Sequence, residues 1–181
     1  MTREDGLEIL FDEQVLEQKV LNLADQISRD YAGKELLLIC VLKGAAIFFA
    51  DLARRLTIPA MLEFAQVSSY GSGTASSRIV TVTKDIASDI SGRHVLLVDG
   101  IIDTGTTMDF LLKRYRERGP ASLRTAVLLD KRAHRTVDVP IDYRGFEIPD
   151  RFVVGYGMDS GEKYRNLPFI AAVRPVDRAT T

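Results

Sequence analysis

The sequence of 181 residues has very little cysteine, because Cys40 is the only one. A single thiol forms no disulfide within the chain, and no CxxC pair is present, so a disulfide framework and a thiolate zinc site are both disfavoured. Cys40 lies in the apolar run 36–42, where a small buried hydrophobic side chain is expected. A chain of this length buries about 70% of its unfolded surface and needs no covalent staple. One domain spanning residues 1–181 is therefore predicted.

The sequence also lacks an excess of charge and a long apolar run. It has 24 basic and 25 acidic side chains, which gives a net charge of −1 and no general attraction to nucleic acid or anionic lipid. No apolar stretch approaches the roughly 18 to 20 residues of a membrane span, and no apolar signal segment follows Met1. We therefore expect a cytoplasmic protein with neither nucleic-acid nor membrane partners. A small anionic ligand in a local pocket stays possible.

Apolar periodicity predicts strands that alternate with helices. The expected helices are 12–32, 45–56 and 106–118. The expected strands are 36–42, 61–68, 79–83, 94–99 and 122–129, with shorter ones at 152–156 and 169–173. This alternation is typical of an α/β domain with a mostly parallel sheet. Ligands of such sheets bind beyond the carboxyl ends of the strands, so the loops after Leu42, Val98 and Leu129 should hold the chemistry.

The most informative stretch is 94–108, an apolar strand that leads through Asp99 and Asp103 into a turn of threonine and glycine. Backbone N–H groups of residues 104–107 and the threonine hydroxyls would converge at a helix N-terminus, which suits a phosphate monoester. Carboxylates beside a phosphate can hold ribose hydroxyls, a divalent metal or a proton in transit. The alternative is that Asp103 only caps the helix. The stretch lacks the Walker lysine and the GxGxxG pattern, so P-loop and dinucleotide-binding folds are disfavoured.

This stretch resembles the phosphoribosyl pyrophosphate (PRPP) motif of the type I phosphoribosyltransferases. Further segments resemble, in order, motifs of the hypoxanthine-guanine branch of that family: 42–44, 69–73, 131–132, 145–156, 158–159 and 164–167. The resemblance covers about residues 8–173. It implies an α/β fold with a central, mostly parallel twisted sheet flanked by helices. It also implies a small hood built from the N- and C-terminal segments, a mobile lid at 69–77, and a homodimer or homotetramer.

The resemblance implies a role for each matching residue. Asp103 would be the catalytic residue, meeting purine N7 as proton acceptor or hydrogen-bond partner. The ribose and its 5′-phosphate would be bound by Asp99, Thr104, Gly105, Thr106 and Thr107. The purine would be bound by Lys131, Phe152, Val153 and Asp159. The pyrophosphate would be bound by Lys43, Gly44 and Arg165. Ser69 and Tyr70 would belong to the lid, and Mg²⁺ would be held by Asp99 and Asp159.

The side chains on the purine side suit these roles. Phe152 offers an apolar plane on which a purine ring can stack. Lys131 carries hydrogen-bond donors and no acceptor, which matches the 6-oxo group of hypoxanthine or guanine and mismatches the amino group of adenine. Val153 would act through its backbone alone. His94 and His134 lack metal-ligand spacing, and we assign them no role.

The activity implied is transfer of the 5-phosphoribosyl group from PRPP to N9 of hypoxanthine or guanine. The products are IMP or GMP and pyrophosphate, and the role is purine salvage. Two alternatives stay open: a regulatory module that senses PRPP or nucleotide without turnover, and a transferase that prefers xanthine. Lys131, Phe152 and Asp159 favour the enzyme, because a PRPP sensor would not require all three.

The sequence departs from the resembled motif at one place. The motif usually carries two adjacent acids, and here the pair reads Asp99-Gly100. The second carboxylate holds ribose hydroxyls in the family, and a hydrogen bond to a charged group contributes roughly 1.5 to 3 kcal/mol. We therefore expect weaker PRPP binding than in a two-acid relative. Gly100→Asp is expected to lower the KM for PRPP about tenfold, toward the lower end of that range because water replaces part of the contact.

Overall fold

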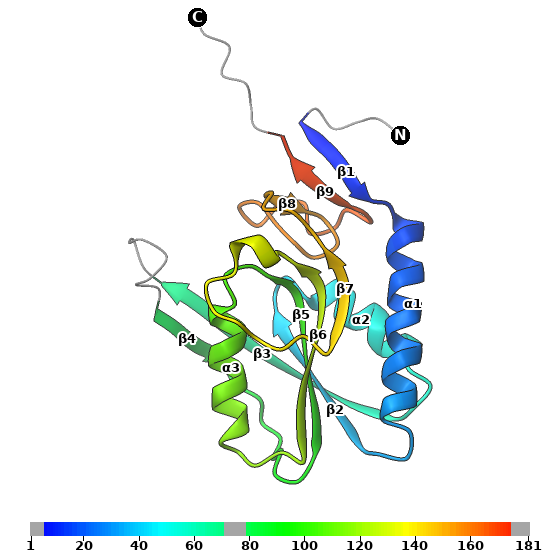
Figure 1. Ribbon diagram of the computed structural model, residues 1–181, viewed down its shortest axis with the longest axis vertical. Helices are drawn as coiled ribbons and strands as arrows, with labels where there is room; N and C mark the ends of the chain where they lie inside the picture. The colour runs from blue at the N-terminus through cyan, green and yellow to red at the C-terminus, as the bar shows by residue number, and fades with distance from the viewer. Residues whose placement is uncertain (1–5, 71–78, 175–181) are drawn as a thin grey trace, which may run out of the picture.

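A six-stranded sheet forms the centre of the computed structural model, which describes residues 6–70 and 79–174 (Figure 1). Its strands, in spatial order, are β4 (Ile79–Lys84), β3 (Ala60–Tyr70), β2 (Leu36–Leu42), β5 (His94–Ile102), β6 (Ser122–Asp130) and β7 (Tyr143–Glu147). β4 runs antiparallel to β3, and all the other neighbours are parallel. The carboxyl ends of the parallel strands therefore share one edge of the sheet.

Helices cover both faces of this sheet. The helices α1 (Glu13–Asp30) and α2 (Ala46–Arg55) pack on one face, and α3 (Thr106–Arg116) packs on the other (Figure 1). The side chains of β2 alternate between two hydrophobic clusters. Leu36, Leu38 and Cys40 join the cluster beneath α1 and α2, and Leu37, Ile39 and Val41 join the cluster beneath α3. A strand buried on both faces reads as a continuous apolar run, as the sequence predicted.

A small antiparallel sheet lies beyond the carboxyl ends of β5 and β6 (Figure 1). It consists of β1 (Leu7–Phe11), β9 (Ile170–Val173) and β8 (Val153–Val154), in that order. Phe11 stacks on Phe146 of β7 with ring centroids 4.0 Å apart, which ties the small sheet to the large one. The predicted α/β fold class, with its small hood of N- and C-terminal strands, is confirmed.

Two local features bear on the predicted site. Of the predicted lid at 69–77, the backbone of Ser69 and Tyr70 ends β3 and pairs with β4, while 71–78 lie outside the described residues. Cys40 is buried, and burial raises the pKa of its thiol to about 12, with the nearby Asp99 as a smaller cause. The thiol is thus protonated and unreactive at neutral pH. Within the described ranges, no helix combines the length and the hydropathy of a membrane span.

Candidate active site

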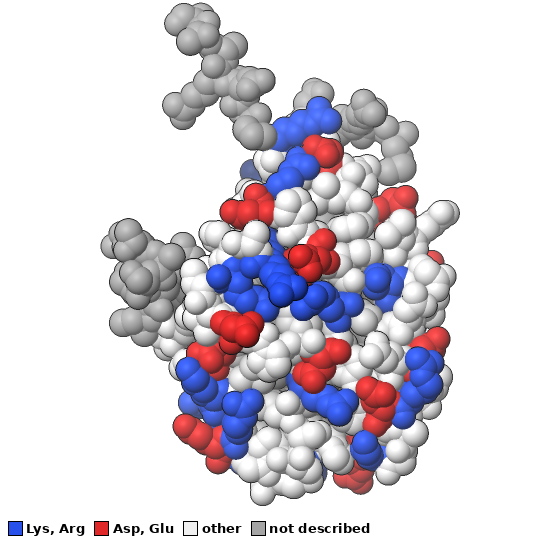
Figure 2. Space-filling view, viewed as in Figure 1, with Lys and Arg blue, Asp and Glu red and all other residues white. Residues whose placement is uncertain are grey.

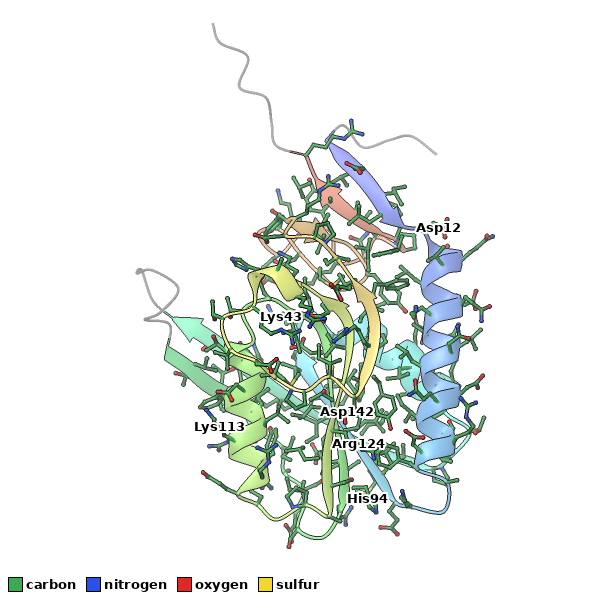
Figure 3. The ribbon with its side chains drawn as sticks, viewed as in Figure 1. Asp12, Lys43, His94, Lys113, Arg124 and Asp142 are labelled. Carbon is green, nitrogen blue, oxygen red and sulfur yellow. The ribbon has the colours of Figure 1, made fainter. Side chains whose placement is uncertain are left out.

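A cleft of about 440 Å³ opens at the carboxyl ends of β2 and β5. Its walls include four of the five residues predicted for the ribose and its 5′-phosphate, namely Asp99, Thr104, Gly105 and Thr107. They also include the catalytic candidate Asp103, together with Gly44 and Asp159. Figure 3 shows Lys43 near this end of the large sheet, whereas His94 lies at the opposite end. The loops after β2, β5 and β6 carry Lys43 and Gly44, residues 103–105, and Lys131, respectively. This placement is expected for a parallel sheet.

The turn between β5 and α3 is held by backbone contacts that leave no room for a side chain at residue 105. Gly105 has φ +88°, and a Cβ atom there would lie 2.3 Å from the carbonyl oxygen of Val137. The carbonyl of Thr104 accepts hydrogen bonds from the N–H groups of Thr136 (2.9 Å) and Val137 (3.0 Å). α3 begins at Thr106, and the first N–H groups of a helix have no partner within it, so they suit an anion.

Asp99 lies within β5, which continues to Ile102 instead of ending at residue 99 as predicted. Its Oδ1 accepts a hydrogen bond of 2.7 Å from the N–H of Gly100. Burial raises the pKa of Asp99 to about 7, and the N–H groups of Gly100 and Ile101 offset part of this rise. Among the described residues, no basic side chain lies within ion-pair distance of this carboxylate. A desolvated carboxylate without a cation fits the binding of a divalent metal.

This raised pKa predicts how Asp99→Asn changes stability. The ordinary pKa of an aspartate is about 3.9. Ionisation of Asp99 in the folded protein therefore opposes folding progressively as the pH rises from about 4 to about 7. Without divalent cations, Asp99→Asn is expected to raise Tm by a few degrees at pH 8 and to change it little at pH 4. Thermal unfolding in a chelator measures this, with the exposed Asp25→Asn as control. An unchanged or lower Tm at pH 8 contradicts it.

Gly100 packs against the loop after β2. A Cβ atom at Gly100 would lie 2.8 Å from the carbonyl oxygen of Gly44, and one at Gly157 would lie 2.3 Å from the same atom. Two glycines thus leave room for one backbone carbonyl of the predicted pyrophosphate loop. This geometry contradicts the tenfold gain predicted for Gly100→Asp, because the new side chain must displace Lys43 and Gly44. The substitution is instead expected to weaken PRPP binding.

The residues predicted for pyrophosphate gather around an acid that sequence reasoning missed. The Leu42–Lys43 peptide is cis. Lys43 Nζ lies 3.1 Å from Glu162 Oε2, and Arg165 Nη2 lies 3.4 Å from the same oxygen. Arg165 Nη2 also lies 2.8 Å from Asp159 Oδ1. Lys43 and Arg165 together hold the pKa of Glu162 below its ordinary range. The one signal in the sequence was the position of Glu162, three residues before Arg165.

Of the residues predicted for the purine, Lys131 lies beside Asp103. Lys131 is buried, and its Nζ lies 3.8 Å from Asp103 Oδ1 and 3.6 Å from Asp150 Oδ1. Phe152 is 56% exposed, so it is free to stack on a ligand and is no core residue. It is not among the residues that line the 440 Å³ cleft. Val153 is buried in β8, where it pairs with β9. The structure therefore joins Lys131 to the catalytic candidate and leaves Phe152 outside the cleft wall.

His134 also contacts Asp103, although the sequence gave it no role. It ends the 3₁₀ turn η2 (Arg132–His134), and its Nδ1 lies 2.5 Å from Asp103 Oδ1. Figure 2 shows basic side chains crowded across the face of the molecule at the level of η2 and β7, with acidic groups around them. Ligand atoms of Asp103, His134 and Asp150 lie within 4.8 Å of one another. We assign them no metal, because the ammonium of Lys131 lies within ion-pair distance of both carboxylates and offsets one of their two negative charges.

Comparison with known proteins identifies the family. Residues 6–161 match the phosphoribosyl transferase domain. The hypoxanthine-guanine phosphoribosyltransferase of Streptococcus thermophilus is 41% identical over 174 residues, which cover 96% of this chain and 97% of that protein. The enzyme of the same name from Mycobacterium tuberculosis is 43% identical over 173 residues, which cover 92% and 86%.

Solved structures agree with these sequence matches. The hypoxanthine phosphoribosyltransferase of Staphylococcus aureus superposes with a TM-score of 0.92 at 38% identity, covering 97% of this chain and 96% of that one. A hypoxanthine-guanine phosphoribosyltransferase of Bacillus anthracis gives 0.88 at 46% identity, covering 92% and 98%. The predicted resemblance to the hypoxanthine-guanine branch is confirmed, and the chain belongs to the phosphoribosyltransferase family of enzymes.

Proposed function

We propose that this protein transfers the 5-phosphoribosyl group of PRPP to N9 of hypoxanthine or guanine. The products are IMP or GMP and pyrophosphate. One observation carries the proposal: Asp103, on the wall of the cleft, lies beside the buried ammonium of Lys131, next to a turn built for a phosphate group. The names of the relatives support the same substrates.

On the PRPP side, we assign binding of the 5′-phosphate to the turn 104–107, through its N–H groups and threonine hydroxyls. Asp99 holds the ribose hydroxyls. Lys43, Gly44 and Arg165 stabilise the charge that develops on pyrophosphate as it leaves, and this is the main electrostatic demand of the reaction. The guanidinium of Arg165 donates to the carbonyl of Gly157 at 2.8 Å, which fixes its direction. A guanidinium makes strong charge-assisted hydrogen bonds to a phosphate.

On the purine side, Lys131 donates to the 6-oxo group and Asp103 accepts from N7. Lone-pair electrons of N9 form the bond to the anomeric carbon as its bond to pyrophosphate breaks. The proton at N7 passes to Asp103, which raises the nucleophilicity of the base. Phe152 stacks on the ring, and the backbone of Val153 meets the edge of the base.

We propose that the metal is Mg²⁺, held by Asp99 and Asp159. Both carboxylates line the same cleft, and carboxylate oxygens are ligands that Mg²⁺ prefers. The burial of Asp99 without a basic partner supports this assignment. When bound, the ion would neutralise negative charge on the pyrophosphate group.

Three further expectations stay predictions: a single domain over residues 1–181, a cytoplasmic location, and a homodimer or homotetramer. The last has support in exposed apolar side chains on α2 and β3, where Ile47 is 42%, Leu62 48% and Phe64 36% exposed. Exposed apolar groups on neighbouring elements favour contact with another protein surface.

Release of pyrophosphate on mixing the protein with PRPP, Mg²⁺ and hypoxanthine tests the proposed function. We expect turnover that requires both the base and PRPP, with one pyrophosphate released per nucleotide formed. Tight binding of PRPP without pyrophosphate release would instead support the regulatory sensor. Absence of both would contradict the proposal.

Lys131→Ala is expected to raise the KM for hypoxanthine and guanine more than the KM for PRPP. The substitution removes the donor that we assign to the 6-oxo group, and such an unmet contact costs about tenfold or more in affinity. Steady-state kinetics with each substrate varied in turn measures the effect. Lys113→Ala, which removes an exposed cation of α3, is the control. If PRPP affinity suffers most, Lys131 belongs to the phosphate side.

A further inference from the structure

His134 and Asp103 come from two loops that are tied together on both sides of their contact. The N–H of Lys131 donates to the carbonyl of Ile102 at 3.0 Å, three residues before His134. The N–H of Thr136 donates to the carbonyl of Thr104 at 2.9 Å, two residues after it. Backbone bonds therefore hold the imidazole and the carboxylate in register.

A buried ion pair anchors the loop after β6, which carries His134, to the interior of the protein. Asp130 is fully buried at the end of β6, and Arg135, the neighbour of His134, donates to its carboxylate. Arg144 Nε of β7 lies 3.0 Å from the other oxygen of Asp130. The side chain of Arg135 is thus directed into the protein, and η2 is anchored next to His134. The backbone that carries His134 is therefore fixed beside Asp103.

The two oxygens of Asp103 have different surroundings. Oδ1 lies 2.5 Å from His134 Nδ1 and 3.8 Å from Lys131 Nζ. For Oδ2, no hydrogen bond or ion pair is present within residues 6–70 and 79–174. A carboxylate oxygen only accepts when ionised, so the proton of this short contact resides on Nδ1. The ionised carboxylate is the form that takes up a proton.

We propose that His134 is a positioning residue for Asp103. It holds Oδ1 and thereby presents Oδ2 to purine N7. The inference rests on the proposed function, because it takes Asp103 as the acceptor for the N7 proton.

Kinetics of two His134 variants test the inference. In asparagine, Nδ2 is bonded to Cγ as Nδ1 is in histidine, so His134→Asn keeps a donor near Oδ1. We expect His134→Ala to lower kcat/KM for hypoxanthine about tenfold at pH 8. His134→Asn should restore most of this loss. His94→Asn is the control, because His94 is the only other histidine and bonds Ser122 at 2.8 Å. A wild-type kcat/KM in His134→Ala, or equal losses in both variants, would overturn the inference.

NMR of the imidazole N–H protons separates this inference from the proposed function. The short contact with Asp103 should move the His134 Nδ1–H proton resonance downfield, and Asp103→Ala should abolish that shift. The resonances of His94, which bonds Ser122, should not move. An unchanged His134 resonance in Asp103→Ala would overturn the pairing and leave the proposed function standing. A wild type that shows the pairing but no turnover would overturn the proposed function, and with it the catalytic role of His134.

Discussion

Gly105→Ala is expected to lower kcat/KM for PRPP at least a hundredfold. Gly105 has φ +88°, which alanine adopts at a cost of roughly 1 to 2 kcal/mol. In addition, the new Cβ would lie 2.3 Å from the carbonyl oxygen of Val137, so the two loops of the site must separate. A displacement of about 1 Å at reacting groups costs on the order of a hundredfold in rate. Steady-state kinetics beside a measurement of unfolding free energy tests the prediction.

Gly33→Ala is the matched control for this substitution. Gly33 has φ +72°, and a Cβ atom there meets nothing within 4 Å. It therefore carries the same kind of backbone strain without the collision, and it should lose stability while keeping normal kinetic constants. If Gly105→Ala has kinetic constants like those of Gly33→Ala, the close packing of the two loops does not position the site.

Asp103→Asn is expected to lower turnover by roughly two to four orders of magnitude while PRPP binding stays nearly normal. The amide keeps the shape of the carboxylate but accepts no proton, and positioned acid–base groups contribute about this much to a rate. In the proposed function, PRPP contacts the turn 104–107 that follows Asp103, so the affinity for PRPP should change little. Turnover and PRPP affinity should be measured separately, by steady-state kinetics and by calorimetry.

Asp150→Asn is the control for the loss of charge. Asp150 Oδ1 lies 3.6 Å from Lys131 Nζ, and Asp103 Oδ1 lies 3.8 Å from the same atom. Both substitutions therefore remove one negative charge beside Lys131, and only one removes the proposed proton acceptor. Equal losses in the two variants would mean that Asp103 acts by holding Lys131. Equal losses of turnover and PRPP affinity in Asp103→Asn would mean that Asp103 acts by positioning.

The sequence predicts the elements whose residues carry their own signal. The apolar run 36–42 coincides with β2, because burial on both faces leaves no polar position inside the strand. α1 begins after Asp12, whose Oδ1 accepts a hydrogen bond of 2.9 Å from the N–H of Val15. This is the usual contact of an aspartate at a helix N-cap. β5 extends beyond its predicted end because its pairing with β6 continues past Asp99 and Gly100, to Ile102.

Two strands of five residues each, β1 and β7, escaped prediction. β1 reads Leu-Glu-Ile-Leu-Phe, and its partner is β9 near the other end of the chain. β7 reads Tyr-Arg-Gly-Phe-Glu, with charged residues on it and a glycine at its centre. That glycine, Gly145, lies so close to β6 that a Cβ atom would meet the carbonyl oxygen of Leu128 at 2.3 Å. Apolar patterns this short do not separate a strand from a helix.

Within the site, the sequence motifs predict which loops carry the functional residues. They do not predict which side chains contact one another, because those contacts depend on the fold. The carboxylate of Asp103 contacts His134 across 31 positions of sequence, and no spacing rule encodes that contact. The missing acid at Gly100 looked like a lost ribose contact. The structure shows instead that the carbonyl of Gly44 occupies the space of a Cβ atom. Such close approaches of backbone to backbone leave only a glycine as their trace in a sequence.

The identity of the nucleotide formed when several bases compete for PRPP tests the central claim most directly. Equal concentrations of hypoxanthine, guanine, xanthine and adenine are mixed with PRPP, Mg²⁺ and a catalytic amount of protein. The initial products are then separated by chromatography. Because Lys131 offers only donors at the 6-position, where hypoxanthine, guanine and xanthine all carry an oxo group, we expect no AMP, and the proposed function predicts IMP and GMP as the main products. Formation of AMP, or XMP as the dominant product, would contradict it.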